Sequence, residues 1–356
     1  MSTSIQAVTT TPPVFPNSLE QAEAVSHALV ADLHAPKSSI FWTDLTLSAL
    51  VGWTAFAVAV AAEPFSALMC FSAAIAAFGL YRGVCFTHEL AHLRRRTLPG
   101  FETAWNLLFG VPLLLPSFTY LGVHQSHHSL SSYGTKEDPE YLTFASSRRM
   151  MMIFAIQSTL LMPVAILLRF VVVAPIALLV PPIHRWLEVH ASSFAMNPEY
   201  RRTVTAETAG KMRRWEIAMI AFWGTMFVSM YAAALPLRTF GVWVGVVTII
   251  SLLNTVRVLG AHEYDSTGAI LSRDGQLGDS IDTPGGPWTE LWAPVGLRYH
   301  ALHHYFPGIP YHNLGLAYRR IVASLPRHAA YLESTSPSLG KSLLVLYDKA
   351  ARAPRR

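Results

Sequence analysis

The chain has 356 residues, of which 52% are hydrophobic and only 14% are charged, and its net charge is +5. This composition is too apolar for an ordinary soluble domain and indicates an integral membrane protein. The basic excess does not indicate nucleic-acid binding, because the arginines cluster beside apolar segments, where an anionic lipid surface is the expected partner. The two cysteines, Cys70 and Cys85, predict neither a disulfide framework nor a CxxC redox pair.

The N-terminal region contains no signal-peptide pattern, since residues 1–16 are rich in Thr and Pro and the first basic residue is Lys37. Residues 18–34 are predicted to form a short amphipathic helix that ends before Pro36. His27 and His34 lie on this helix, and we expect both to face solvent.

Four segments have the roughly 20 apolar residues that a membrane-spanning helix needs. They are residues 41–62, 65–86, 214–235 and 239–260. Residues 102–121 are apolar but contain Gly110, Pro112 and Pro116, which predicts a re-entrant or interfacial segment. Residues 150–182 are interrupted by several prolines and are predicted to form a short hairpin or to lie at the interface.

The positive-inside rule orients these segments, because nearly all arginines near the apolar stretches fall on one side. The short loops on the other side contain only Arg238. We therefore expect both termini and all three histidine motifs described below to be cytoplasmic. The expected organisation is a cytosolic tail (1–38), a membrane domain (39–325) and a basic cytosolic C-terminal tail (326–356).

Eight of the fifteen histidines lie in three short boxes beside apolar segments. These are His88 and His92 in an HxxxH motif, His124, His127 and His128 in an HxxHH motif, and His300, His303 and His304 in a second HxxHH motif. On a helix, residues three or four apart share a face, so each box can direct several ring nitrogens at one point. Eight imidazoles are too many for one tetrahedral zinc and predict two metal ions side by side.

Further candidates lie near the boxes. His262 follows the last predicted span at the same depth, which makes it a candidate ninth ligand. Metal-bound histidines usually donate their other N–H to a carboxylate. The candidate acids for this role are Glu89, Asp138, Glu140, Glu263 and Asp265. His312 is expected to cap a helix or to support a ligand, whereas His184, His190 and His328 are expected to be surface or structural residues.

Two other classes of protein share parts of this pattern. The first box also spells HExxH, the motif of zinc proteases, with Glu89 as general base. That interpretation leaves both HxxHH boxes unexplained, and the last two predicted spans contain no aspartate ligand. A metal transporter would place its site near the middle of the bilayer, inside the spans, whereas these boxes lie at or beyond the span ends.

The ordered set of three boxes resembles the membrane fatty acid desaturase family, which includes related hydroxylases and ketolases. Residues 133–141 (YGTKEDPEY) after the second box and residues 292–312 around the third resemble the family as well. The resemblance implies an all-α integral membrane protein. Four transmembrane helices and re-entrant or interfacial segments would support a cytosolic, histidine-rich helical cap.

The resemblance also implies two non-haem iron ions, with O2 as co-substrate and a fatty acyl substrate in the bilayer. Electrons would come from a separate donor of the ferredoxin, rubredoxin or cytochrome b5 type. The preferred interpretation is a fatty acid desaturase acting on an acyl-lipid or acyl-thioester. Hydroxylation or ketone formation on an acyl or isoprenoid chain uses the same site and remains the alternative.

Overall fold

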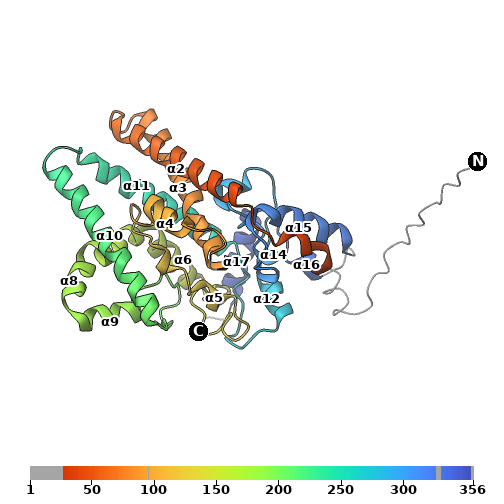
Figure 1. The fold of residues 1–356 in the computed structure, drawn as a ribbon. Helices are drawn as coiled ribbons and strands as arrows, with labels where there is room; N and C mark the ends of the chain where they lie inside the picture. Colours follow the sequence, from red (N-terminus) through yellow and green to blue (C-terminus); the bar gives the residue numbers. More distant parts are fainter. Residues whose placement is uncertain (1–26, 95, 326–329, 354–356) are drawn as a thin grey trace, which may run out of the picture.

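The computed structural model describes residues 27–94, 96–325 and 330–353, and these residues are mostly helical, with no strand longer than an isolated bridge (Figure 1). The long elements are α2 (Ser38–Ala61), α3 (Ala67–His92), α10 (Ala206–Tyr231) and α11 (Arg238–Leu259). Short elements between α3 and α10 are α4 (Phe101–Trp105), η2 (Asn106–Gly110), η3 (Ser117–Thr119), α5 (His124–His127), η4 (Phe144–Ser146), α6 (Arg148–Ile156), η5 (Gln157–Leu161), α7 (Met162–Leu167), η6 (Leu168–Val173), α8 (Ala174–Leu179) and α9 (Pro181–His190). The remainder comprises η1 (Ala31–Leu33), α12 (Arg273–Asp279), α13 (Thr289–Trp292), α14 (His300–Tyr305), α15 (Tyr311–Ser324), α16 (Ala330–Glu333) and α17 (Leu339–Arg352).

Four helical segments are long and apolar enough to cross a membrane: α2, α3, Arg148–Leu179 and α11. Three of them confirm the predicted spans at 41–62, 65–86 and 239–260. The predicted span at 214–235 overlaps α10, which ends at Tyr231 and is not among the four because charged residues occupy its first half.

Chain connectivity nevertheless favours α10 as the crossing partner of α11. The backbone N–H groups of Met196 and Asn197 donate to the Pro139 carbonyl, and the Arg202 side chain donates to the Leu121 carbonyl, so the chain is beside the second box before α10 begins. Helix α9 spans about 15 Å, too short to return across a hydrocarbon core of about 30 Å. This connectivity favours an arrangement in which Arg148–Leu179 and α9 begin and end on the same side, with α10 and α11 as the crossing pair.

The segment predicted as a short hairpin is a continuous helix from Arg148 to Leu179 that turns only at Val180. Its internal prolines do not break it, because a π-helical turn precedes each one: η5 comes before Pro163 and η6 before Pro175. A π turn redistributes the backbone hydrogen bonds where proline provides no N–H. The turn therefore falls at the Pro181–Pro182 pair.

Residues 101–119 form a re-entrant segment between the long helices, as predicted. The Asn106 side chain closes its base through hydrogen bonds with the hydroxyl and the backbone N–H of Ser117, at 2.8 and 2.9 Å. At its tip, tryptophan indoles of three surrounding helices donate to backbone carbonyls: Trp53 to Leu108, Trp223 to Val111 and Trp243 to Pro112. These bonds satisfy backbone groups that have no water to bind at that depth.

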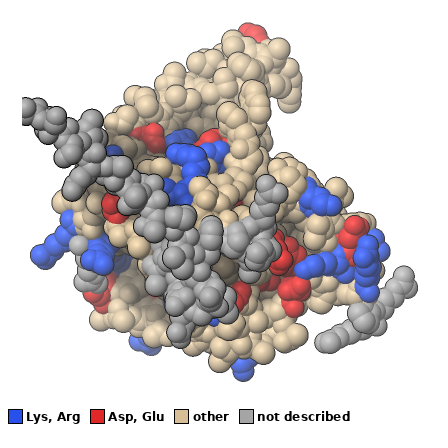
Figure 2. Space-filling model, turned by 90° about the vertical axis from the view of Figure 1, so that its right-hand side faces the viewer, with Lys and Arg blue, Asp and Glu red and all other residues tan. Residues whose placement is uncertain are grey.

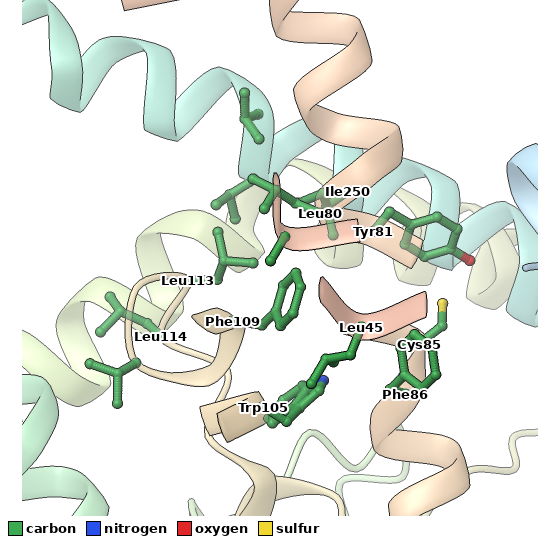
Figure 3. Close-up of a cluster of buried hydrophobic side chains, with 14 of the residues drawn as sticks. Leu45, Leu80, Tyr81, Cys85, Phe86, Trp105, Phe109, Leu113, Leu114 and Ile250 are labelled. Atoms are coloured by element: carbon green, nitrogen blue, oxygen red, sulfur yellow. The ribbon is translucent and has the colours of Figure 1, made fainter. Parts of the chain in front are cut away.

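The side chain of Phe109 fills the space between the re-entrant segment and α3. Figure 3 shows Phe109 between Leu80 and Trp105 in the apolar core. Gly83 makes this position possible, since a Cβ atom at residue 83 would lie 1.9 Å from Cε1 of Phe109. This packing therefore holds the C-terminal half of α3, the helix that ends in the first histidine box.

The polar C-terminal third folds against the ends of the long helices. Within the predicted basic tail, α17 packs on this body, with Leu346 buried beside Tyr264 and Phe144. Of the predicted helix 18–34, only residues 27–34 are described, and His27 and His34 are exposed there as expected. The rest of that helix lies outside the described residues.

Candidate metal centre

The three boxes lie on three separate helices that meet at one end of the bundle. His88 and His92 occupy the last turns of α3, where a spacing of four places both on one face. The second box forms α5 and its C-cap residue His128, and the third box forms most of α14. His262 follows α11 directly and is held by an antiparallel bridge to Ser280.

The nine histidines form two groups, each with ring nitrogens within 4.8 Å of one another. One group contains His88, His92, His124, His128 and His303, and the other contains His127, His262, His300 and His304. Each HxxHH box contributes to both groups, because its three histidines point in different directions around a helical turn. The structure thus brings together all nine predicted histidines, including His262.

The ring nitrogens face one another across short distances. In the first group, Nε2 of His303 lies 3.0 Å from Nε2 of His92. In the second group, Nε2 of His262 lies 2.8 Å from that of His300 and 3.3 Å from that of His127. Lone pairs that converge in this way suit a shared cation.

Acidic side chains hold the outward-facing nitrogens. Nδ1 of His127 is 3.0 Å from Asp138, which is fully buried, and Nδ1 of His124 is 2.9 Å from Glu140. A proton on Nδ1 that is donated to a carboxylate leaves Nε2 unprotonated and directed at the centre. Asp138 and Glu140 therefore lie where the sequence predicts supporting acids.

A relay that the sequence analysis missed supports His262. Nδ1 of His262 donates to the Tyr133 hydroxyl at 2.8 Å, and that hydroxyl donates to Asp279 at 2.7 Å. Tyr133 belongs to the YGTKEDPEY segment, so the sequence contained a signal for it. Asp279 lies 17 residues beyond His262 in the sequence, and no pattern there singles it out.

The remaining predicted acids differ in position. Glu89 accepts the Tyr311 backbone N–H at 3.0 Å and lies 3.8 Å from Nδ1 of His88. Glu263 and Asp265 each pair with Lys349 of α17 at 2.7 Å, and no described contact joins either one to a box histidine. The prediction that these two acids support the histidines is therefore wrong: they bind helix α17 instead.

Burial keeps most of these imidazoles neutral. Desolvation, followed by repulsion from neighbouring histidines, holds the pKa values of His124, His128, His300, His303 and His304 well below the usual range. Burial lowers the pKa of His127 as well. The charge of Asp138 and its hydrogen bond to His127 raise that pKa by more, so the pKa of His127 lies above its usual value. Neutral imidazole is the form that binds metals.

Unpartnered nitrogens indicate what these groups accommodate. Neither ring nitrogen of His88 has a hydrogen-bond partner, although both are buried. Buried polar atoms without partners are costly unless they have another role. A metal ion in the group that contains His88 would satisfy one of these nitrogens, and the Nε2 atoms that converge in the other group suit a second ion, so the residues fit a two-metal site.

The other histidines have structural roles. Nε2 of His312 accepts the backbone N–H of Lys37, the N-cap residue of α2, at 3.1 Å, which matches the expected capping role. His184 is bonded to Glu216 at 2.9 Å, and His190 stacks on Trp186. His328 lies outside the described residues.

Comparison with known proteins agrees with this geometry. The sequence pattern of the fatty acid desaturase family matches residues 62–336 of the chain. A ceramide hydroxylase from Caulobacter vibrioides (strain NA1000 / CB15N) is 36% identical over 327 residues, covering 90% of this chain and 92% of that protein. The matched region contains all nine histidines, and the chain therefore belongs to the fatty acid desaturase family of membrane diiron oxidoreductases.

Proposed function

We propose that the chain is an O2-dependent diiron hydroxylase that acts on an alkyl chain of ceramide or a closely related membrane lipid. The observation that carries the proposal is the pair of converging histidine groups at the ends of apolar helices. The hydroxylase relative, which matches over nearly its whole length, favours hydroxylation over the desaturation preferred from the boxes alone.

Two iron ions bound by these groups would supply an oxidant able to break an unactivated C–H bond. One oxygen atom of O2 enters the C–H bond, and the other leaves as water with two protons and two electrons. The nine histidines would be the ligands, and Asp138, Glu140 and the Tyr133–Asp279 relay would hold their rings in the binding orientation. Because the rings are buried, bulk water is kept from the reacting carbon.

The reaction needs two electrons from a donor. A separate donor of the ferredoxin, rubredoxin or cytochrome b5 type is part of the proposal. The proposed orientation places the histidine groups on the cytoplasmic side, where such donors are found.

Desaturation is the second candidate, and the family match supports it. It removes a second hydrogen instead of returning oxygen to the carbon, and both oxygen atoms leave as water. The histidine ligands would serve either outcome.

One experiment separates the two reactions. The full chain and a His303→Ala control would be produced in a host that makes ceramide, under dioxygen labelled with heavy oxygen, and lipids would be analysed by mass spectrometry. We expect a lipid that has gained one labelled oxygen atom and is absent from the control. A product that has lost two hydrogens and gained no label would establish desaturation, and no O2-dependent product would overturn the proposal.

A further inference from the structure

A large cavity with several polar side chains in its lining lies beside the histidine groups, between α3, α13 and α15. Its volume is about 690 Å³, and its polar lining includes Arg82, Glu290, Arg298, Tyr299, Tyr311 and Arg319. Figure 2 shows basic side chains in a hollow at the base of the projecting helices, flanked by acidic ones. Neither the predicted metal ligands nor their supporting acids line this cavity.

The cavity lies at the end of α3 that carries the first histidine box, where lipid headgroups are expected. Arg82 precedes His88 by six residues on α3, which places it about 9 Å closer to the bilayer. It pairs with Asp44 of α2 at 2.6 Å, and the Tyr311 hydroxyl donates to the same carboxylate at 2.8 Å. A polar cavity at this level, beside apolar helix surfaces, can receive the polar end of a lipid whose chains remain in the bilayer.

The two inner arginines each face a carboxylate, Arg82 that of Asp44 and Arg298 that of Glu290. Glu290 lies 3.5 Å from Arg82 and 3.4 Å from Arg298, and its carboxylate is partly exposed. Arg319 adds an exposed cation at the rim. The cavity therefore offers donors and acceptors side by side, and a phosphate group would meet the Glu290 carboxylate. Hydroxyl and amide groups use both kinds of partner without a charge conflict.

The cavity shares a wall with the histidine site. The backbone N–H of Tyr311 donates to Glu89, the neighbour of His88. Tyr299 lines the cavity and directly precedes His300. A lipid whose polar end occupies the cavity would therefore lie next to the residues that carry the first and third histidine boxes.

From these observations we infer that this cavity binds the uncharged, hydroxyl- and amide-bearing headgroup of the lipid substrate. The inference rests on the proposed function for the identity of the reacting chain. Glu290 accepts hydrogen bonds from the headgroup and selects against phosphorylated headgroups. Arg319 donates hydrogen bonds to the headgroup at the rim of the cavity.

Binding can be measured without turnover. The purified full-length protein, in lipid nanodiscs and without reductant, would be titrated with a fluorescent short-chain ceramide and with its 1-phosphate ester. Glu290→Gln and Arg319→Gln would be compared with Glu137→Gln and Arg213→Gln, which change exposed side chains outside the cavity. Thermal unfolding of every variant would verify folding.

We expect the ceramide to bind at least tenfold more tightly than the phosphate ester. Glu290→Gln should reduce that preference about tenfold by improving phosphate binding, and Arg319→Gln should weaken both ligands, while the controls match the parent chain. A parent chain that prefers the phosphate ester, or cavity variants that behave as the controls do, would overturn the inference. Because no oxidation is needed, correct binding without any oxidised product would refute the proposed function and leave the cavity assignment standing.

Discussion

Single carboxylates decide which nitrogen of each imidazole is available to a metal. Asp138 is the most constrained of them, because it accepts from Nδ1 of His127 and from the backbone N–H groups of Gly134 and Glu140 at 2.8 and 2.9 Å. It thus fixes the ring of His127 and the loop that follows the second box together.

The substitution Asp138→Asn should lower iron affinity about 10- to 100-fold, because an amide cannot accept all of these bonds and one ring loses its orienting partner. Iron bound per chain would be measured by mass spectrometry of the metal after dialysis against graded iron concentrations. The matched control is Glu137→Gln, an exposed neighbour that pairs only with Lys136 and Thr135. Equal iron retention in both variants would show that Asp138 does not support a ligand.

The residue scale also shows what the sequence could and could not predict. The nine histidines were predictable because their spacing and depth are local properties. The failure of Glu263 and Asp265 has a local cause too: side chains on extended backbone alternate between faces, so the neighbour of inward-facing His262 points outward. Asp279 lies near His262 because an antiparallel bridge pairs His262 with Ser280, the neighbour of Asp279. A single sequence does not reveal that pairing.

At the scale of elements, the least predictable one is the helical hairpin formed by Arg148–Leu179 and α9. Its prolines predict breaks in the helix, but the π turns accommodate the prolines and the helix continues through them. The hairpin is anchored by a buried charge: Arg169 pairs with Glu216 of α10 at 2.6 Å and donates to the Ala191 carbonyl at 2.7 Å. Glu216 accepts from His184 as well, so three helices share one carboxylate.

The substitution Glu216→Leu should destabilise the protein by about 3–5 kcal/mol, because it leaves Arg169 as an unpaired buried charge. The double variant Arg169→Leu with Glu216→Leu should recover most of that loss, since neither charge remains. Thermal unfolding in detergent, followed by circular dichroism, would compare both with Glu199→Leu at an exposed site. A double variant no more stable than the single one would show that packing, and not charge pairing, holds the hairpin.

For the molecule as a whole, the arrangement of helices predicts which ends lie on the same side of the membrane. Glu63 is exposed at the α2–α3 turn, Ser131 is exposed beside the second box, and of the native cysteines only Cys70 is exposed. In a Cys70→Ser background, a membrane-impermeant maleimide should label Glu63→Cys in intact cells and Ser131→Cys only after permeabilisation. The reverse pattern would place the histidine groups outside the cytoplasm and contradict the proposed orientation.

The histidine groups also join parts of the chain that have few other reasons to stay together. The ligands come from the end of α3, from α5 and its C-cap, from His262 after α11 and from α14, and their inward nitrogens bind one another poorly without a cation. Metal that binds only the folded state stabilises it by about 4 kcal/mol at a thousandfold excess over its dissociation constant.

Removal of iron by a chelator should therefore lower the unfolding temperature of the full chain markedly. His303→Ala, which loses one of five ligands in one group and none in the other, should show a smaller but still measurable response to the chelator. If the parent chain unfolds at the same temperature with and without the chelator, after loss of iron has been verified, the two groups do not hold the cap together through a metal.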